Sequence, residues 1–359
     1  MSRWRIYRER IVDVLRGAKK SRVLLLLAEG GFGKSIALQQ FLQNDGEPYA
    51  YYRVQPETTT LFGFLRGLTE SLEPFIPGAH LSLTMAHERA MQSQTPFVEL
   101  ANWFGEHLRD ATLRIAIDDL RNASSDAVID FLLRATARTP PAVKWTIAAR
   151  PSRISAITWR ARGDVDVPID ESVLAFTKAE LEHLARHCRV SISGSRLEQI
   201  FGATEGWPSA AALALVRPDA VAAGDRKVPR DELYATLAQA AFGRHDVATR
   251  ELLLQTAVYS SMHEDVLRAD GIVARFTELF ETDGIYIDEL GGGRYRYDSL
   301  MRAYLLRQLE AAPDLQASAY VRAAAACERM GRWEDALAFH RKANASDASA
   351  RILAERGFA

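Results

Sequence analysis

A glycine-rich turn followed by lysine and serine is the part of this sequence best suited to chemistry. Residues 28–35 read AEGGFGKS and match the phosphate-binding pattern G-x-x-x-x-G-K-[ST], except that Ala28 replaces the first glycine. Glycines let backbone N–H groups turn toward phosphate oxygens, and the next helix adds partial positive charge. We therefore expect Lys34 to reach the β- and γ-phosphates and the Ser35 hydroxyl to bind Mg²⁺. The alternative is a chance glycine-rich turn between a strand and a helix.

Two consecutive aspartates, Asp118 and Asp119, follow the apolar run 113–117. A carboxylate at the end of a buried strand beside a phosphate loop can hold Mg²⁺. A second carboxylate can polarise an attacking water. We assign Asp118 to the metal and Asp119 to water activation. The alternative is that these aspartates cap the N-terminus of a helix, a position that aspartate favours.

A basic residue, Arg150, follows a further apolar run at 144–149. Ligands of open α/β sheets bind at the C-terminal edge of the strands, so a guanidinium placed there can sense a γ-phosphate. The predicted catalytic residues are therefore Lys34, Asp119 and Arg150. The alternative for Arg150 is a surface ion pair.

Short apolar runs alternate with helical patterns in the first half of the chain. Uninterrupted apolar runs suit strands that are buried on both faces of a parallel sheet. This alternation predicts an α/β P-loop NTPase domain with a mainly parallel sheet. The predicted strands are 23–27, 49–54, 113–117, 144–149 and 165–169, and the predicted helices are 5–20, 35–43, 60–72, 97–108 and 127–136.

After residue 170 the pattern changes to helices. Two alternating stretches, 284–290 and 294–297, flank three glycines and predict a hairpin, because glycine accepts positive φ. Helices before and after this hairpin suggest a winged-helix module. The segment from 317 onward reads as a helix–turn–helix pair, which cannot bury its own face and so indicates the start of a repeat array. The predicted helices before the hairpin are 177–186, 196–201, 209–216, 231–242 and 247–258, and 300–310 follows it.

Four domains are predicted from these patterns. They are a P-loop nucleotide-binding domain at 1–171, a helical lid domain at 172–230, a winged-helix domain at 231–311 and the start of a TPR-like helical repeat at 312–359. The lid includes a charged, proline-containing linker at 217–230.

The composition is that of a globular protein, with 48% hydrophobic and 25% charged residues among 359. A net charge of −1 argues against a globally basic nucleic-acid binder. Two widely separated cysteines exclude a disulfide scaffold and a cysteine-type zinc site. Apolar runs are far shorter than the roughly 18 residues of a membrane-spanning helix. We expect a cytoplasmic protein that does not bind membranes.

The order of these features resembles the MalT-like branch of the STAND ATPases, the LuxR-type ATP-dependent transcriptional regulators. These are P-loop switches related to the NB-ARC and NACHT proteins. In that branch the phosphate loop often begins with alanine, and the paired aspartates and Arg150 match its Walker B and sensor positions. Residues 204–208, TEGWP, match an element whose proline lies near the adenine. Residues 297–305, YDSLMRAYL, are similar to its winged-helix segment YHPLFREFL, and 8–15 resembles the segment leading into the nucleotide pocket.

This resemblance implies ATP or ADP and Mg²⁺ as cofactors, with Ser35 and Asp118 at the metal. The family usually has histidine at the position of Asp298, where it contacts the β-phosphate of ADP. A carboxylate there would repel phosphate unless it were protonated, bridged by metal or turned away. The residues implied to hold the nucleotide are Arg8, Glu29, Gly30, Gly31, Phe32, Gly33, Lys34, Ser35, Ile36, Pro208 and Asp298.

The implied function is an ATP/ADP-operated signal-transduction switch that regulates transcription. Hydrolysis is expected to be slow, with nucleotide-dependent domain rearrangement and self-oligomerisation in the ATP state. The helical repeat would receive a small-molecule inducer or a partner protein. DNA binding is expected only through a helix-turn-helix outside this chain. The alternatives are a P-loop enzyme with a dedicated substrate and a scaffold that holds ADP without turnover.

Overall fold

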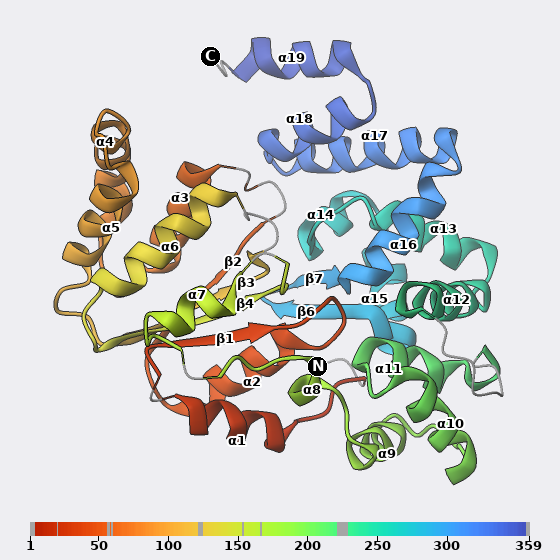
Figure 1. Cartoon of the computed structure of the whole chain (residues 1–359). Helices are drawn as coiled ribbons and strands as arrows, with labels where there is room; N and C mark the ends of the chain where they lie inside the picture. The colour runs from red at the N-terminus through yellow and green to blue at the C-terminus, as the bar shows by residue number, and fades with distance from the viewer. Residues whose placement is uncertain are drawn as a thin grey trace. The chain divides into compact units, whose positions relative to one another are not determined.

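A four-stranded parallel sheet is the centre of the N-terminal part of the chain in the computed structural model (Figure 1). The structure describes residues 4–19, 21–55, 58, 60–120, 125–152, 154–165, 167–220 and 229–356. The chain divides into two compact units. One is Tyr7–Ala175, and the other combines Met1–Ile6 with Phe176–Ala359.

The sheet of the first unit has the strand order β1-β4-β3-β2. The predicted parallel sheet is therefore confirmed. The fifth predicted strand, 165–169, is not a full strand, because among its described residues only Ile169 bridges the sheet, in parallel with Leu26 of β1. The strands are β1 (Val23–Leu27), β2 (Tyr49–Arg53), β3 (Leu113–Asp118) and β4 (Val143–Ala149).

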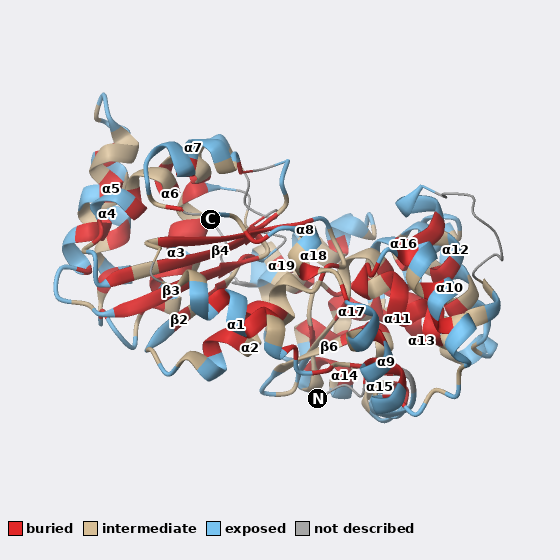
Figure 2. Cartoon of the chain, turned by 60° about the horizontal axis from the view of Figure 1, so that its bottom comes forward, coloured by how far each residue is buried: buried red, intermediate tan, exposed pale blue. Residues whose placement is uncertain are grey.

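Both faces of this sheet are covered by helices, and the residues of β1 and β3 are buried throughout (Figure 2). On one face an aromatic cluster links three helices to β4. The ring of Phe104 lies 5.7 Å from that of Phe131 and 5.9 Å from that of Trp145, and Phe64 lies 6.5 Å from Phe131. This burial explains why β1 and β3 need apolar residues on both faces.

The helices of the first unit largely follow the predicted ones. Three helices, α4, α7 and α8, were not predicted. In α4, Leu81 and Met85 are 75% and 74% exposed and obscure the apolar period that marks a buried face. The helices are α1 (Glu9–Ala18), α2 (Lys34–Asp45), α3 (Leu61–Ser71), α4 (Ala79–Met91), α5 (Pro96–His107), α6 (Asp126–Arg138), α7 (Ala156–Ala161) and α8 (Glu171–Leu174).

The second unit is mostly helical and contains a small antiparallel sheet of order β5-β7-β6. Its strands are β5 (Met262–His263), β6 (Ile287–Gly291) and β7 (Arg294–Tyr297). The predicted hairpin is present, and Gly291, Gly292 and Gly293 all have positive φ. The segment 4–6 belongs to this unit, with Trp4 and Ile6 buried and Arg5 paired with Asp288 of β6.

The helices of the second unit confirm the change of pattern after residue 170. Residues 221–228 of the predicted linker lie outside the described residues. The helices are α9 (Lys178–His187), α10 (Gly194–Thr204), α11 (Pro208–Val216), η2 (Pro218–Ala220), α12 (Arg230–Gly243), α13 (Val247–Thr256), α14 (Glu264–Ala269), α15 (Val273–Asp283), η3 (Gly284–Tyr286), α16 (Ser299–Glu310), α17 (Pro313–Arg329), α18 (Trp333–Lys342) and α19 (Ser346–Arg356).

Three consecutive helices close the described chain, and one carboxylate joins them. Glu328 of α17 lies 2.6 Å from His340 of α18 and accepts a 2.7 Å bond from Arg351 of α19. These charge-assisted contacts lower the pKa of Glu328 despite its partial burial. The three helices therefore share a polar link in addition to their apolar packing.

Among the described residues, none of the helices combines the length and the apolar character that crossing a membrane requires.

Candidate functional site

The glycine-rich loop leaves β1 and enters α2 through two left-handed residues. Gly31 has φ of 79° and Gly33 has φ of 76°, a region that side chains rarely adopt. A Cβ on Gly33 would meet no atom within 4 Å, so backbone conformation rather than crowding requires glycine there. Phe32 is buried, at 1% exposure, and fixes the loop to the interior of the unit. Gly30 lies in this same turn.

Lys34 is the first residue of α2, and its side chain folds back over the loop. Its Nζ donates to the carbonyl oxygens of Ala28 at 2.6 Å and of Glu29 at 2.8 Å. A helix N-terminus already carries partial positive charge, and the ammonium adds a full charge beside it. The loop and the start of α2 therefore form a positively charged cradle suited to phosphate. Ile36 is half-buried in the first turn of α2.

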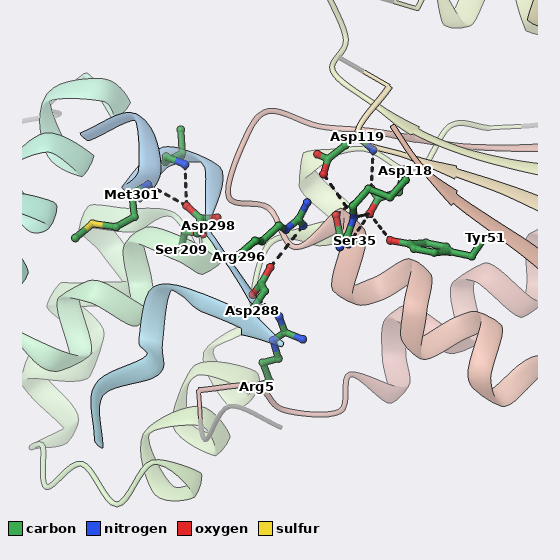
Figure 3. Close-up of polar contacts among 12 residues, drawn as sticks. Arg5, Ser35, Tyr51, Asp118, Asp119, Ser209, Asp288, Arg296, Asp298 and Met301 are labelled. Atoms are coloured by element: carbon green, nitrogen blue, oxygen red, sulfur yellow. Dashed lines mark hydrogen bonds and ion pairs between the residues drawn. The ribbon is translucent and has the colours of Figure 1, made fainter. Parts of the chain in front are cut away.

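Ser35 and Asp118 are brought together although they are distant in sequence (Figure 3). The Ser35 hydroxyl donates to Asp118 Oδ1 at 2.9 Å, and Asp118 is 1% exposed. Because β4 lies between β1 and β3, the two predicted metal ligands meet through side chains and not through neighbouring strands. Hydroxyl and carboxylate oxygens are the donors that Mg²⁺ prefers, so this pair fits a magnesium site.

Two residues that the sequence analysis did not select complete this cluster. The Tyr51 hydroxyl donates to Asp118 Oδ2 at 2.6 Å, and the Arg53 guanidinium donates to the same oxygen at 3.0 Å and 3.2 Å. Both belong to β2, two residues apart and hence on one face. The parallel register pairs Arg53 with Asp118. The sequence signal that could have identified Arg53 is a charged residue at the end of a strand. The same signal marks Asp118 at the end of β3.

Asp119 follows β3 in an unusual backbone conformation. Its φ is 57°, in the left-handed region, and its N–H donates to Asp118 Oδ1 at 2.9 Å. Asp119 Oδ2 lies 3.7 Å from the Nε of Arg53. Strained backbone of this kind is concentrated at functional sites, where the surrounding structure enforces it.

Arg150, which follows β4, lies at the same edge of the sheet and pairs with the loop. Its Nε is 3.8 Å from Glu29 Oε2, and both side chains are partly exposed. The backbone N–H of Glu29 donates to Glu171 Oε1 of α8 at 3.0 Å. Glu29 therefore links the phosphate loop to two later segments of the unit, and Glu171 is a contact that the sequence analysis did not identify.

Arg8 lies in the first unit, where its guanidinium donates to backbone carbonyls at the C-terminal end of α8. The bonds to the oxygens of Leu174 and Ala175 are both 2.8 Å. Arg10 donates to Val173 and Ala175 in the same way. Cations stabilise helix C-termini, so the two arginines hold the end of this segment in place.

Pro208 and Asp298 belong to the second unit. Pro208 is buried at the first position of α11, where its fixed φ suits a helix start. It follows Gly206, whose φ is 73° and where a Cβ would lie 2.3 Å from the carbonyl oxygen of Phe176. The TEGWP element is thus a tight turn that packs backbone against backbone.

Asp298 is the N-cap of α16. Its Oδ1 accepts from the N–H groups of Leu300 at 2.9 Å and Met301 at 3.3 Å. The hydroxyls of Ser209 and Tyr234 approach its two oxygens at 3.4 Å and 3.3 Å. Burial, reinforced by the charge of Asp288, raises the pKa of Asp298. Burial and Asp298 also raise the pKa of Tyr234 well above its ordinary value.

No protein-family model matches the chain. Curated proteins similar in sequence include the serine/threonine-protein kinases PknK of Mycobacterium tuberculosis and Mycobacterium bovis, each 26% identical over 219 residues. That match covers 58% of this chain and 19% of each kinase. A solved structure, the STAND protein PH0952 from Pyrococcus horikoshii with a tetratricopeptide repeat sensor, superposes with a TM-score of 0.64 over 98% of this chain, at 13% identity.

The chain has the fold of a STAND ATPase. The predicted combination of a P-loop α/β domain and a helical region is thereby confirmed at the level of fold. The chain spans half of the solved STAND protein and about a fifth of the kinases. The closer assignment to the MalT-like, LuxR-type branch remains a prediction from the motifs.

Proposed function

We propose that this chain is an ATP/ADP-operated signal-transduction switch. The observation that carries the proposal is the contact between Ser35, at the end of the glycine-rich loop, and Asp118, at the end of another strand. A chance glycine-rich turn would not require a buried carboxylate beside its serine. The STAND fold supports the same conclusion.

Within this proposal, the loop from Glu29 to Ile36 holds the phosphates and Lys34 supplies the cation beside them. Ser35 and Asp118 hold Mg²⁺, which would neutralise phosphate charge when bound. Asp119 orients and polarises the attacking water, and Arg150 senses the γ-phosphate. These are roles for residues that lie together at one edge of the sheet.

The resemblance adds candidates whose roles are proposed on that ground alone. They are Arg8, at the segment leading to the pocket, Pro208 at the adenine, and residue 298. For Asp298 the contacts favour capping of α16, because both helix N–H groups donate to its carboxylate. The two roles predict different ADP affinities for Asp298→Asn: capping leaves the affinity unchanged, whereas nucleotide contact alters it.

The boundaries 1–171, 172–230, 231–311 and 312–359 are retained as the proposed domains. We assign α12 to α16 with the small sheet to a winged-helix domain, and α17 to α19 to the start of a TPR-like sensor. The exposed residues of α15, the helix before the hairpin, include Glu278, Glu281 and Arg275. Two acids against one base do not suit a phosphate backbone, so DNA contact through α15 is disfavoured.

The wider role proposed is regulation of transcription, with slow hydrolysis acting as a timer. A change at the γ-phosphate would alter which domain contacts are favourable, and the ATP form would self-associate. The inducer would be a small molecule or a partner protein at the helical repeat. We propose a cytoplasmic location without membrane binding.

The decisive test is nucleotide binding by the purified chain and by Lys34→Ala. We expect MgATP to bind the wild type and the variant to lose at least about 100-fold in affinity, since the cation in the phosphate cradle is removed. Lys178→Ala, at an exposed lysine paired with Glu198 in the second unit, is the matched control. Equal ATP affinity in Lys34→Ala would refute the loop assignment.

The same preparations separate the switch from its alternatives. The protein is denatured, and any released nucleotide is identified by chromatography. A steady turnover well above about 1 s⁻¹ would favour an enzyme with a dedicated substrate. Tightly held ADP with no measurable turnover would favour a scaffold.

A further inference from the structure

Arg53 places a cation between Asp118, proposed to hold the metal, and Asp119, proposed to polarise water. Its guanidinium lies 3.0 Å and 3.2 Å from Asp118 Oδ2, and its Nε lies 3.7 Å from Asp119 Oδ2. The side chain of Arg53 is 11% exposed and that of Asp118 is 1% exposed. One guanidinium therefore serves two consecutive carboxylates where water has little access (Figure 3 shows the two aspartates).

The charge balance of this cluster bears on metal binding. Asp118 and Asp119 together carry two negative charges when both are ionised, and such carboxylates attract divalent cations. Arg53 cancels one of these charges. At a shielded site the interaction between charges a few ångströms apart is several times stronger than in water. Arg53 therefore competes with a divalent cation for the same pair of aspartates.

The oxygens of Asp118 are also fully used as acceptors. Oδ2 accepts from Arg53 and from the Tyr51 hydroxyl, whereas Oδ1 accepts from Ser35 and from the N–H of Asp119. A carboxylate offers about four lone-pair sites. A cation that approaches Asp118 must displace one of these donors, and among these four Arg53 carries a charge.

We propose that Arg53 is an internal counter-cation that prevents Asp118 and Asp119 from holding a divalent cation in the absence of nucleotide. The metal then enters together with phosphate oxygens, which supply the negative charge that Arg53 cancels. The inference rests on the metal site of the proposed function, but not on ATP hydrolysis.

The test measures Mn²⁺ binding to the full chain without nucleotide, from the electron paramagnetic resonance signal of the free ion. Arg53→Gln is expected to lower the Kd for Mn²⁺ by about tenfold or more, because one opposing charge is removed. Arg53→Lys keeps the charge, so its Kd for Mn²⁺ should stay closer to the wild-type value than that of Arg53→Gln does. Adding Asp118→Asn to Arg53→Gln should abolish the gain, since it removes the carboxylate.

Tyr51→Phe is the matched control, because it removes a neutral donor from the same oxygen and leaves the charge unchanged. It should alter the Kd for Mn²⁺ by less than about twofold, the difference expected between a neutral and a charged donor. A gain in Tyr51→Phe equal to that in Arg53→Gln would overturn the proposal. So would a Kd in Arg53→Gln that equals the wild-type value.

A second variant keeps the test open if Arg53→Gln folds poorly. Arg53→Met retains the apolar stem against the Tyr51 ring, over which the guanidinium carbon lies at 5.5 Å from the ring centre. Mn²⁺ should raise the melting temperature of this variant more than that of the wild type, and an equal rise contradicts the inference. These assays contain no ATP, so their outcome does not depend on nucleotide binding. If Arg53→Gln gains Mn²⁺ affinity but the separate assay detects no ATP binding, the nucleotide switch is refuted and the counter-cation role of Arg53 is retained.

Discussion

Two aspartates, the buried Asp118 of the first unit and the half-buried Asp298 of the second, are stabilised in different ways. Asp118 ends a strand and has a guanidinium as partner, at 3.0 Å. Asp298 begins a helix and accepts from backbone N–H groups of that helix, at 2.9 Å and 3.3 Å. Each also accepts from a serine and a tyrosine hydroxyl.

The partner of each carboxylate indicates whether that carboxylate can exchange its contact for a ligand. Asp118 contacts a side chain, whereas Asp298 contacts the backbone of a helix. A mobile cationic side chain can be exchanged for another cation, so Asp118 can take part in ligand binding. A helix N-terminus is part of the backbone, so Asp298 is committed to holding α16 in place. In the proposed function, the same residue type therefore serves chemistry in one unit, where Asp118 is buried, and helix capping in the other, where Asp298 is half-buried.

The largest effect is expected from Asp118→Asn. The variant replaces a metal-binding carboxylate by an amide, and we expect Mg²⁺-dependent ATP turnover to fall by about 100-fold or more. Phosphate release at matched protein concentration measures it. Asp298→Asn is the control, with an expected change below about threefold. A comparable loss in both variants would break the comparison.

Asp119→Asn should separate binding from hydrolysis in the first unit. The amide keeps the size of the side chain and tolerates the left-handed backbone, but it cannot polarise water as a carboxylate does. We expect ATP affinity within about twofold of the wild type and turnover reduced by roughly 100-fold. Equilibrium binding of a fluorescent ATP analogue and phosphate release give the two values. Unchanged turnover would remove Asp119 from its proposed role.

A smaller effect on stability is expected at Asp298. Loss of the cap in Asp298→Ala should cost about 1–2 kcal/mol in free energy of unfolding, whereas Asn preserves a capping oxygen. Burial raises the pKa of Asp298 above its ordinary value of 3.8, so the folded state holds the proton more tightly than the unfolded state. Its ionisation therefore lowers stability as pH rises from 3.8 through the raised pKa.

Asp298→Asn removes this pH-dependent loss, so its free energy of unfolding should decline less than that of the wild type over this range. Urea titrations at several pH values measure the difference, and identical profiles would contradict it. ADP affinity supplies the second comparison. A capping role leaves it unchanged, whereas tighter ADP binding in Asp298→Asn would indicate that the carboxylate had repelled a phosphate.

The smallest effect concerns the backbone at Asp119. Glycine adopts a φ of 57° without steric cost, and a gain of about 1 kcal/mol is expected for Asp119→Gly. For a unit of this size that corresponds to a melting temperature about 2–4 °C higher. Calorimetry of the nucleotide-free chain measures it. A lower melting temperature would mean that the contact with Arg53 outweighs the strain.

The phosphate loop and the parallel sheet could be predicted because they depend on local patterns. Residues 28–35 carry their conformation in their glycines, and the buried strands are uninterrupted apolar runs. The proximity of Ser35 and Asp118 was expected because both were assigned to the same Mg²⁺ site. The insertion of β4 between β1 and β3 could not be predicted, since strand order depends on packing across the whole unit.

Arg53 and Tyr51 were missed for a related reason. A tyrosine-rich strand that ends in arginine is typical of many edge strands, and only the register with β3 shows that both side chains meet Asp118. Asp298 could be located by resemblance, but its contacts with Ser209 of α11 and Tyr234 of α12 depend on tertiary structure. The contribution of Glu171 likewise depends on tertiary structure.

The left-handed residue after β3 marks a compromise between folding and function. A single substitution is expected to raise the thermal stability, since glycine at position 119 adopts the left-handed backbone without steric cost. That exchange would also delete the side chain proposed to prepare water for attack. Screens that select for heat resistance alone should therefore enrich glycine here and return robust but inactive molecules.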